Sequence, residues 1–332
     1  MKLRWSVLLQ WEALLVALLV ATFVIGSSVA EAFLTGENLS LASADLMEKA
    51  IMALGLTLVI LAGEIDLSVA SVLGLSSAIV GATVDAGVPL SLAIGIALLA
   101  GALAGLFNGL LVAKLGLPSL VVTLGTLALY RGLAFVVLGD RAVSEFPQGF
   151  TDFGFNNVPG TLIPWPAILF AILALATFLV LHRSWIGREV YAIGNNEEAA
   201  RFSGIDVDRV KVGLFVASGT LAAVAGVVFT ARFASARPDN GLGFELDVIS
   251  AVLLGGVSIF GGRGTLVGVV LALFLIGALR NVLALEDVAA EKQSIAIGTL
   301  LIVSVIATNA LRGVQERAAR RRSAPSPADQ PT

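Results

Sequence analysis

The 332-residue sequence contains no cysteine and a single histidine, His182. Without cysteine the chain has no disulfide bond, no thiol nucleophile and no cysteine-bound zinc. One histidine cannot build a histidine-based metal cluster or support a serine–histidine catalytic relay. We therefore expect no metal site, no cofactor and no catalytic residue on this chain.

Charge is also scarce, because only 14% of the residues are Asp, Glu, Lys or Arg, whereas soluble domains carry about 25%. The net charge of -3 gives no reason to expect a nucleic-acid partner. Apolar residues make up 57% of the chain, more than a core of this size can hold in water. The composition predicts an all-α polytopic protein that lies in the lipid bilayer.

The apolar residues fall into ten candidate spans, since a bilayer core of about 30 Å needs about 20 apolar residues per helix. The first span could be mistaken for a signal peptide, but no convincing cleavage site precedes a soluble domain, so we expect it to be retained. Three spans are short and rich in Gly and Ser, as expected where helices break around a pathway. The expected spans are 12–30, 46–63, 66–84, 89–112, 119–139, 162–181, 210–232, 246–260, 265–285 and 293–311.

Ten spans would place both termini on one side, and that side would hold 14 of the 21 Lys and Arg residues. The positive-inside rule then predicts cytoplasmic termini. We divide the chain into a transmembrane domain, residues 1–319, and a basic, Pro-rich tail, residues 320–332, which we expect to be disordered. Residues 140–160 read as a loop with a possible short helix, and residues 182–210 as a long cytoplasmic loop.

The long loop contains the pattern of a short capped helix. Asn195 and Asn196 can cap it, Glu197 and Glu198 suit its first turn, and Gly204 can end it. Such a helix could dock in a groove of another protein, or it could be an ordinary capped helix at the membrane interface. The residues that would form the docking surface are Asn195, Asn196, Glu197, Glu198, Ala199, Ala200, Arg201, Ser203 and Gly204.

This loop and three further segments resemble a known family. Glu198-Ala199-Ala200, followed by Gly204, is similar to the EAA loop with which permeases of ABC importers contact their ATPase subunit. The surrounding AIGNNEEAARFSGIDVDRVK resembles the ribose-type sugar permeases. So do the segments GEIDLSVASVLGL, GLFNGLLVAKLGLPSLVVTLGTLALYRGLA and ELDVISAVLLGGVSIFGGRGTLVG.

Within that family the stretches WEALLVALLVATF, AGEIDLSVA and VVLGDRA look most like rhamnose-import permeases, whereas FTDF and Phe233-x-Ser235-Ala236-Arg237 are shared with autoinducer-2 permeases. The resemblance implies a type II-like permease bundle with broken helices in a bacterial inner membrane. It implies separate ATPase subunits, a second permease chain, identical or paralogous, and an extracytoplasmic sugar-binding protein. Two departures, Glu64 in place of a glycine and EDVAAEKQSIAIG in place of a more aromatic segment, weaken the transfer of ribose as the substrate.

Two acids, Glu64 and Asp66, need an explanation inside an apolar region. An ionised side chain at the bilayer centre costs about 2.5–3.5 kcal/mol on insertion scales. Residues two apart on a continuous helix point to different faces, so one of them would face lipid. We therefore predict a helix break near Gly63, with Asp66 or Ser68 capping the next helix. Both acids could line the translocation pathway, or both could be solvated by headgroups at the end of a helical hairpin.

Further polar residues fall within apolar runs. Arg131 must pair with an acid or face water, and a structural ion pair is the first interpretation. Asn108, Thr123 and Thr126 could line a polar pathway or could hold helices together by hydrogen bonds. The candidate pathway residues are Glu64, Asp66, Ser68, Asn108, Thr123, Thr126 and Arg131.

Three classes of function compete for this sequence. The first is an ATP-driven importer subunit; since the chain has no Walker A motif, ATP would bind a separate chain. The second is an ion-coupled secondary transporter, which would use Glu64, Asp66 and Arg131 and would need no docking helix. The third, a membrane-embedded enzyme, has no nucleophile–base pair or metal set to support it.

Overall fold

The computed structural model of the protein describes residues 2–300 and 302. The described residues fall into two units, one that ends at Asp287 and one that begins at Val288. In the described part of the second unit, residues 290–300 are helical. No strand occurs among the described residues, where β-type pairing is limited to the isolated bridges Val143–Ala236 and Asn157–Pro164.

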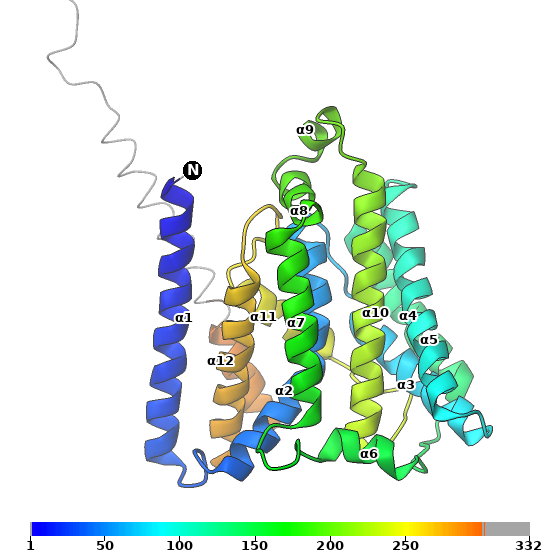
Figure 1. Ribbon diagram of the computed structural model, residues 1–332, viewed down its shortest axis with the longest axis vertical. Coiled ribbons are helices and arrows are strands. Elements are labelled where there is room, and N and C mark those ends of the chain that lie inside the picture. The colour runs from blue at the N-terminus through cyan, green and yellow to red at the C-terminus, as the bar shows by residue number, and fades with distance from the viewer. Residues whose placement is uncertain (1, 301, 303–332) are drawn as a thin grey trace, which may run out of the picture. The chain divides into compact units, whose positions relative to one another are not determined.

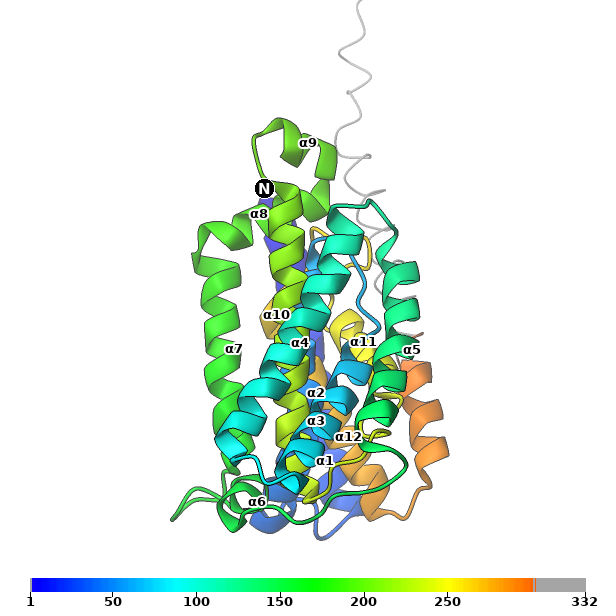
Figure 2. The same cartoon turned by 90° about the vertical axis from the view of Figure 1, so that its right-hand side faces the viewer.

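The first unit is a helical bundle, shown from two sides in Figures 1 and 2. One end of the bundle holds α8 and α9, and the opposite end holds α6. Its helices are α1 (Lys2–Val29), α2 (Gly36–Leu61), α3 (Val69–Asp85), α4 (Leu90–Ala113), α5 (Ser119–Leu138), α6 (Gln148–Phe155), α7 (Trp165–Arg183), α8 (Trp185–Asn195), α9 (Glu197–Phe202), α10 (Val207–Phe233), α11 (Phe244–Leu254) and α12 (Leu266–Leu285).

Six of the described helices are long and apolar enough to cross a membrane: α1 (from Trp11), α4, α5, α7, α10 and α12. The all-helical membrane class is therefore confirmed, while the count of ten spans stays a prediction. α2 has the length of a span, but Asp45, Glu48 and Lys49 lie within it. α3 is apolar but has only 17 residues.

Most expected segments lie on helices of the structure, and the predicted short helix in residues 140–160 is α6. The expected segment 246–260 is wrong at its end, because α11 stops at Leu254 and Gly256 adopts a positive φ of 87°. Segment 293–311 begins in the described helix of the second unit, but much of it lies outside the described residues, as does the tail 320–332.

α10 packs beside α4 (Figures 1 and 2). Gly101, Gly105 and Gly109 on α4 recur every four residues and face the α10 backbone. A Cβ atom at Gly109 would lie 2.9 Å from the Cα of Val212. Small residues at this spacing let two membrane helices approach closely, which is a usual basis of helix association in lipid.

Two segments interrupt the helices inside the bundle. The predicted break near Gly63 is confirmed: α2 ends at Leu61, Gly63 has a φ of 84°, and α3 starts only at Val69. A second non-helical segment, residues 234–243, joins α10 to the short helix α11. We call these segments the first linker (residues 62–68) and the second linker (residues 234–243).

Candidate functional site

The pair α8–α9 extends from the same end of the bundle as the start of α10 (Figure 1). The Tyr191 hydroxyl donates to the Gly264 carbonyl over 2.8 Å, and burial raises the pKa of Tyr191 to about 12. Asn195 Nδ2 donates to the Gly262 carbonyl over 3.2 Å, and the Gly262 N–H donates to the Leu61 carbonyl over 2.8 Å. These bonds join the end of α8 to the last residue of α2.

The predicted capped helix is confirmed as α9. The Asn196 side chain accepts a hydrogen bond from the Ala199 N–H over 2.9 Å, and Gly204 has a φ of 85°, as expected of a helix end. Asn195 instead ends α8 and does not cap α9. Ala200 is buried, whereas the neighbouring Phe202 is 92% exposed, a feature that the sequence analysis missed.

α9 joins a network of ion pairs through Glu197. Arg201 Nη2 lies 2.9 Å from Glu197 and 2.7 Å from Asp208, and Lys114 Nζ lies 3.2 Å from Asp208. Partial burial acts to raise the pKa of Glu197, but hydrogen bonds from Lys211 and Arg201 outweigh it and lower that pKa. Glu197 is therefore a carboxylate at neutral pH.

Lys211, on the second turn of α10, connects this network to the first linker. Its Nζ lies 2.5 Å from Glu64 Oε1 and 2.7 Å from Glu197 Oε2. The Lys211 side chain is 8% exposed and that of Glu64 is 14% exposed. Lys211 was not predicted as a contact residue, because it falls at the start of the expected span 210–232 and nothing local in the sequence marks its partners.

Asp66 is 1% exposed, so the interpretation in which headgroups solvate it is wrong. Its Oδ1 accepts hydrogen bonds from the Ser68 N–H over 3.0 Å and from Ser68 Oγ over 2.6 Å. Its Oδ2 accepts one from Ser218 Oγ of α10 over 2.8 Å. Ser68 is the N-cap residue of α3 by position, but its side chain makes no capping hydrogen bond, and Asp66 binds Ser68 itself rather than the first turn of the helix.

Other predicted pathway residues surround the same point. Asn108 Nδ2 donates to Ser68 Oγ over 2.9 Å, and the Tyr130 hydroxyl, missed in the sequence, lies 3.2 Å from Asn108 Oδ1. Thr123 Oγ1 donates to the Ile65 carbonyl over 3.2 Å. Thr126 bonds only within α5, over a long 3.5 Å. These contacts join α4 and α5 to the first linker, and a role along a pathway stays a prediction.

Arg131 lies apart from this cluster and makes no ion pair with the described acids. Its guanidinium donates to the carbonyls of Pro238 at 2.6 Å, Asn240 at 2.9 Å and Ala70 at 3.1 Å. The expected structural ion pair is therefore wrong, because backbone oxygens of the second linker and of α3 take the place of an acid.

Two ion-pair clusters on α2, both missed, reach α10, α11 and α12. Arg232 Nε lies 2.6 Å from Glu48 Oε1, and Arg232 also pairs with Asp45. Asp247 pairs with Lys49 over 2.6 Å and with Arg280 over 2.7 Å. They were not predictable from the sequence, because each cluster pairs residues from distant segments.

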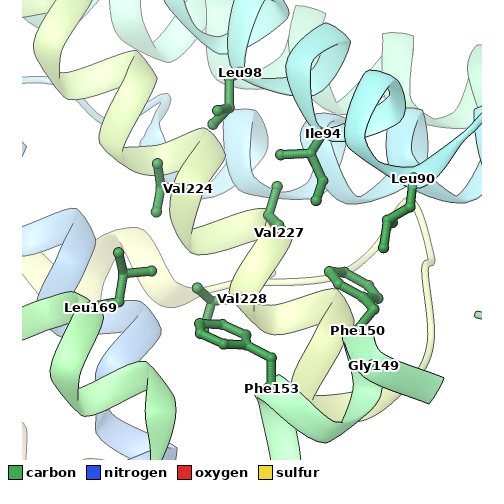
Figure 3. A pocket seen from close by; sticks show the side chains of 10 residues that line it. All are labelled: Leu90, Ile94, Leu98, Gly149, Phe150, Phe153, Leu169, Val224, Val227 and Val228. Carbon is green, nitrogen blue, oxygen red and sulfur yellow. The ribbon is translucent and has the colours of Figure 1, made fainter. Parts of the chain in front are cut away.

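A cavity of about 420 Å³ lies between α4, α6, α7 and α10 (Figure 3). Its walls carry no polar side chain, so they offer a sugar no side-chain hydrogen bond. Selective sites need a few placed polar groups, and we therefore place no substrate there. The lining residues are Leu90, Ile94, Leu98, Gly149, Phe150, Phe153, Leu169, Val224, Val227 and Val228.

Comparison with known proteins identifies the family. Residues 39–305 match the family described as branched-chain amino acid transport system / permease component. The chain is 37% identical over 336 residues to the autoinducer 2 import system permease protein LsrD of Escherichia coli K12 and to that of Shigella flexneri, covering 98% of this chain and all of each relative. No solved structure shows a significant match. The chain belongs to this family of permease components of ABC importers.

Proposed function

We propose that this chain is a membrane permease subunit that imports autoinducer-2, driven by ATP hydrolysis on a separate ATPase subunit. Membership of an ABC-importer family, with relatives named as autoinducer 2 permeases over their full length, supports this reading over our first expectation of rhamnose. The observation that carries the ATPase role is α9, a capped helix outside the bundle with an exposed phenylalanine.

The docking role of α9 is tested by Phe202→Ala. Aromatic residues, phenylalanine included, are enriched at protein interfaces, and truncation of an interface hot spot costs about 2 kcal/mol or more. We expect the variant to insert normally and to lose most of the copurifying ATPase subunit. Phe155→Ala, which removes another exposed phenylalanine from α6 at the opposite end, is the matched control. Equal ATPase recovery from both variants would contradict the docking role.

The substrate is tested in proteoliposomes that contain the complete importer and its binding protein. We expect ATP-dependent uptake of autoinducer-2. Uptake of L-rhamnose instead would select the second candidate, which the rhamnose-permease-like segments such as AGEIDLSVA favour. Uptake driven by an ion gradient without ATP would instead establish a secondary transporter.

We further propose that both termini and α9 face the cytoplasm, since 14 of 21 basic residues fall on that side in a ten-span topology. The chain has no cysteine, so Asn196→Cys places a single thiol at the N-cap of α9. We expect an impermeant thiol reagent to label it in inverted vesicles and not in intact cells. Labelling in intact cells would reverse the topology.

A further inference from the structure

Lys211 differs from the other basic residues near α9 in where it lies. Arg201 and Lys114 are about half exposed, and surface ion pairs of that kind contribute about 0–1 kcal/mol. The Lys211 side chain is buried and contacts two acids from two separate segments, Glu197 of α9 and Glu64 of the first linker. Lys211 is thus a buried connection between the surface helix and the interior of the bundle.

α10 holds the first linker at two points. Lys211 binds Glu64 and Ser218 binds Asp66, and the two α10 residues are seven positions apart, about two helical turns or 10 Å. In an extended chain, side chains two apart point to the same face. One face of α10 therefore contacts both acids of the linker. Of these two acids, Glu64 is the one connected to α9, because its partner Lys211 also binds Glu197.

We propose that Lys211 is a positioning residue that couples movement of α9 to the break between α2 and α3, an inference that rests on the function proposed above. When the ATPase subunit displaces α9, Glu197 carries Lys211 with it, and Lys211 shifts Glu64 and the linker. The buried Asp66 cluster at the far end of the linker then moves with the start of α3.

The variant that cuts this connection is Glu64→Leu. Lys211 keeps Glu197 as its partner, so no buried charge is left unpaired, and a leucine fits a side chain that is 14% exposed. The measurement uses proteoliposomes with the complete importer and gives the ratio of ATP molecules hydrolysed to autoinducer-2 molecules imported. We expect this ratio to rise at least about fivefold, which is the lower end of the coupling factors found between two sites. The glutamine of Glu64→Gln still accepts a hydrogen bond from Lys211, so its ratio should lie close to that of the unmodified chain.

Two controls separate coupling from stability. Arg209→Gln removes an 85% exposed arginine from the start of α10, two positions before Lys211, and should leave the ratio unchanged because its ion-pair partner is the exposed Asp206. The thermal midpoint and the amount of bound ATPase should be the same for Glu64→Leu as for the unmodified chain. A normal ratio in Glu64→Leu overturns the proposal, as does a raised ratio accompanied by loss of bound ATPase. If the unmodified chain shows no ATP-dependent uptake, the proposed function fails instead, before any variant is compared.

Discussion

The two linkers solve one problem in different ways. Non-helical backbone at membrane depth survives only where protein or water satisfies its polar groups. The first linker uses its own carboxylate in part, since Asp66 accepts the Ser68 N–H, while Ser119 and Thr123 of α5 bind the Ile65 backbone. The second linker relies on a neighbour, because Arg131 of α5 donates to the carbonyls of Pro238 and Asn240. We therefore expect the first linker to depend most on Asp66, which lies within it, and the second linker to depend most on Arg131, which lies outside it.

The largest effect is expected from Arg131→Met, which removes the donor from three carbonyls at once. Each buried acceptor left without a partner costs about 1–3 kcal/mol. We expect a large drop in the thermal midpoint of the detergent-solubilised protein, measured by fluorescence-detected size exclusion. Arg141→Met removes an exposed arginine paired with Asp85 and should shift the midpoint little. Similar midpoints for both variants would show that the structure of the second linker does not depend on Arg131.

Asp66→Leu should rank second, because it leaves the hydroxyls of Ser68 and Ser218 without their acceptor. The expected cost is about 2–3 kcal/mol of stability, read from the same thermal assay. Asp66→Asn keeps the shape and one acceptor oxygen, and the Ser218 hydroxyl can rotate to accept from the new amide. We expect it to lose less than half as much. Equal stability of Asp66→Leu and Asp66→Asn would mean that the hydrogen bonds of Asp66 do not stabilise the first linker.

Gly74→Ala tests how closely the second linker lies on α3. A Cβ atom there would stand 2.9 Å from the Asn240 carbonyl oxygen and would also meet the Arg131 guanidinium. Overpacking of this kind costs about 1–3 kcal/mol. Gly95→Ala on α4 meets nothing within 4 Å and should be neutral or stabilising, by up to about 1 kcal/mol, through helix propensity. Thermal midpoints that move in the same direction would contradict the close contact.

Ser119→Ala should have the smallest effect. Its Oγ accepts the Ile65 N–H over 3.1 Å, and losing one such bond costs about 1 kcal/mol. We expect little change in the global midpoint but faster hydrogen exchange at the Ile65 amide, measured by mass spectrometry of the linker peptide. Ser28→Ala, whose hydroxyl bonds only within α1, is the control. Unchanged exchange would show that the linker backbone has another partner.

The first linker was predictable from the sequence, because two acids two positions apart cannot share one lipid-free helix face. α9 was also predictable, since its caps are local and carried by Asn196 and Gly204. The second linker's contact with Arg131 was not, because the acceptors are carbonyls that every residue possesses. Lys211 was missed for a related reason: its two acids come from distant segments, and only the fold brings them to one amine.

The pairing of Lys211 with Glu64 limits how freely parts of such permeases can be exchanged. A docking helix grafted from another transporter to recruit a different ATPase would bring its own residue to the place of Glu197. Lys211 would then keep only Glu64 unless the graft carried an acid at that position. If Lys211 couples α9 to the linker as proposed, we expect a chimera designed around the exposed surface of α9 alone to bind the new ATPase subunit without coupling it to the first linker. Engineers should therefore transplant residues 197–211 as one piece and match position 64 to it.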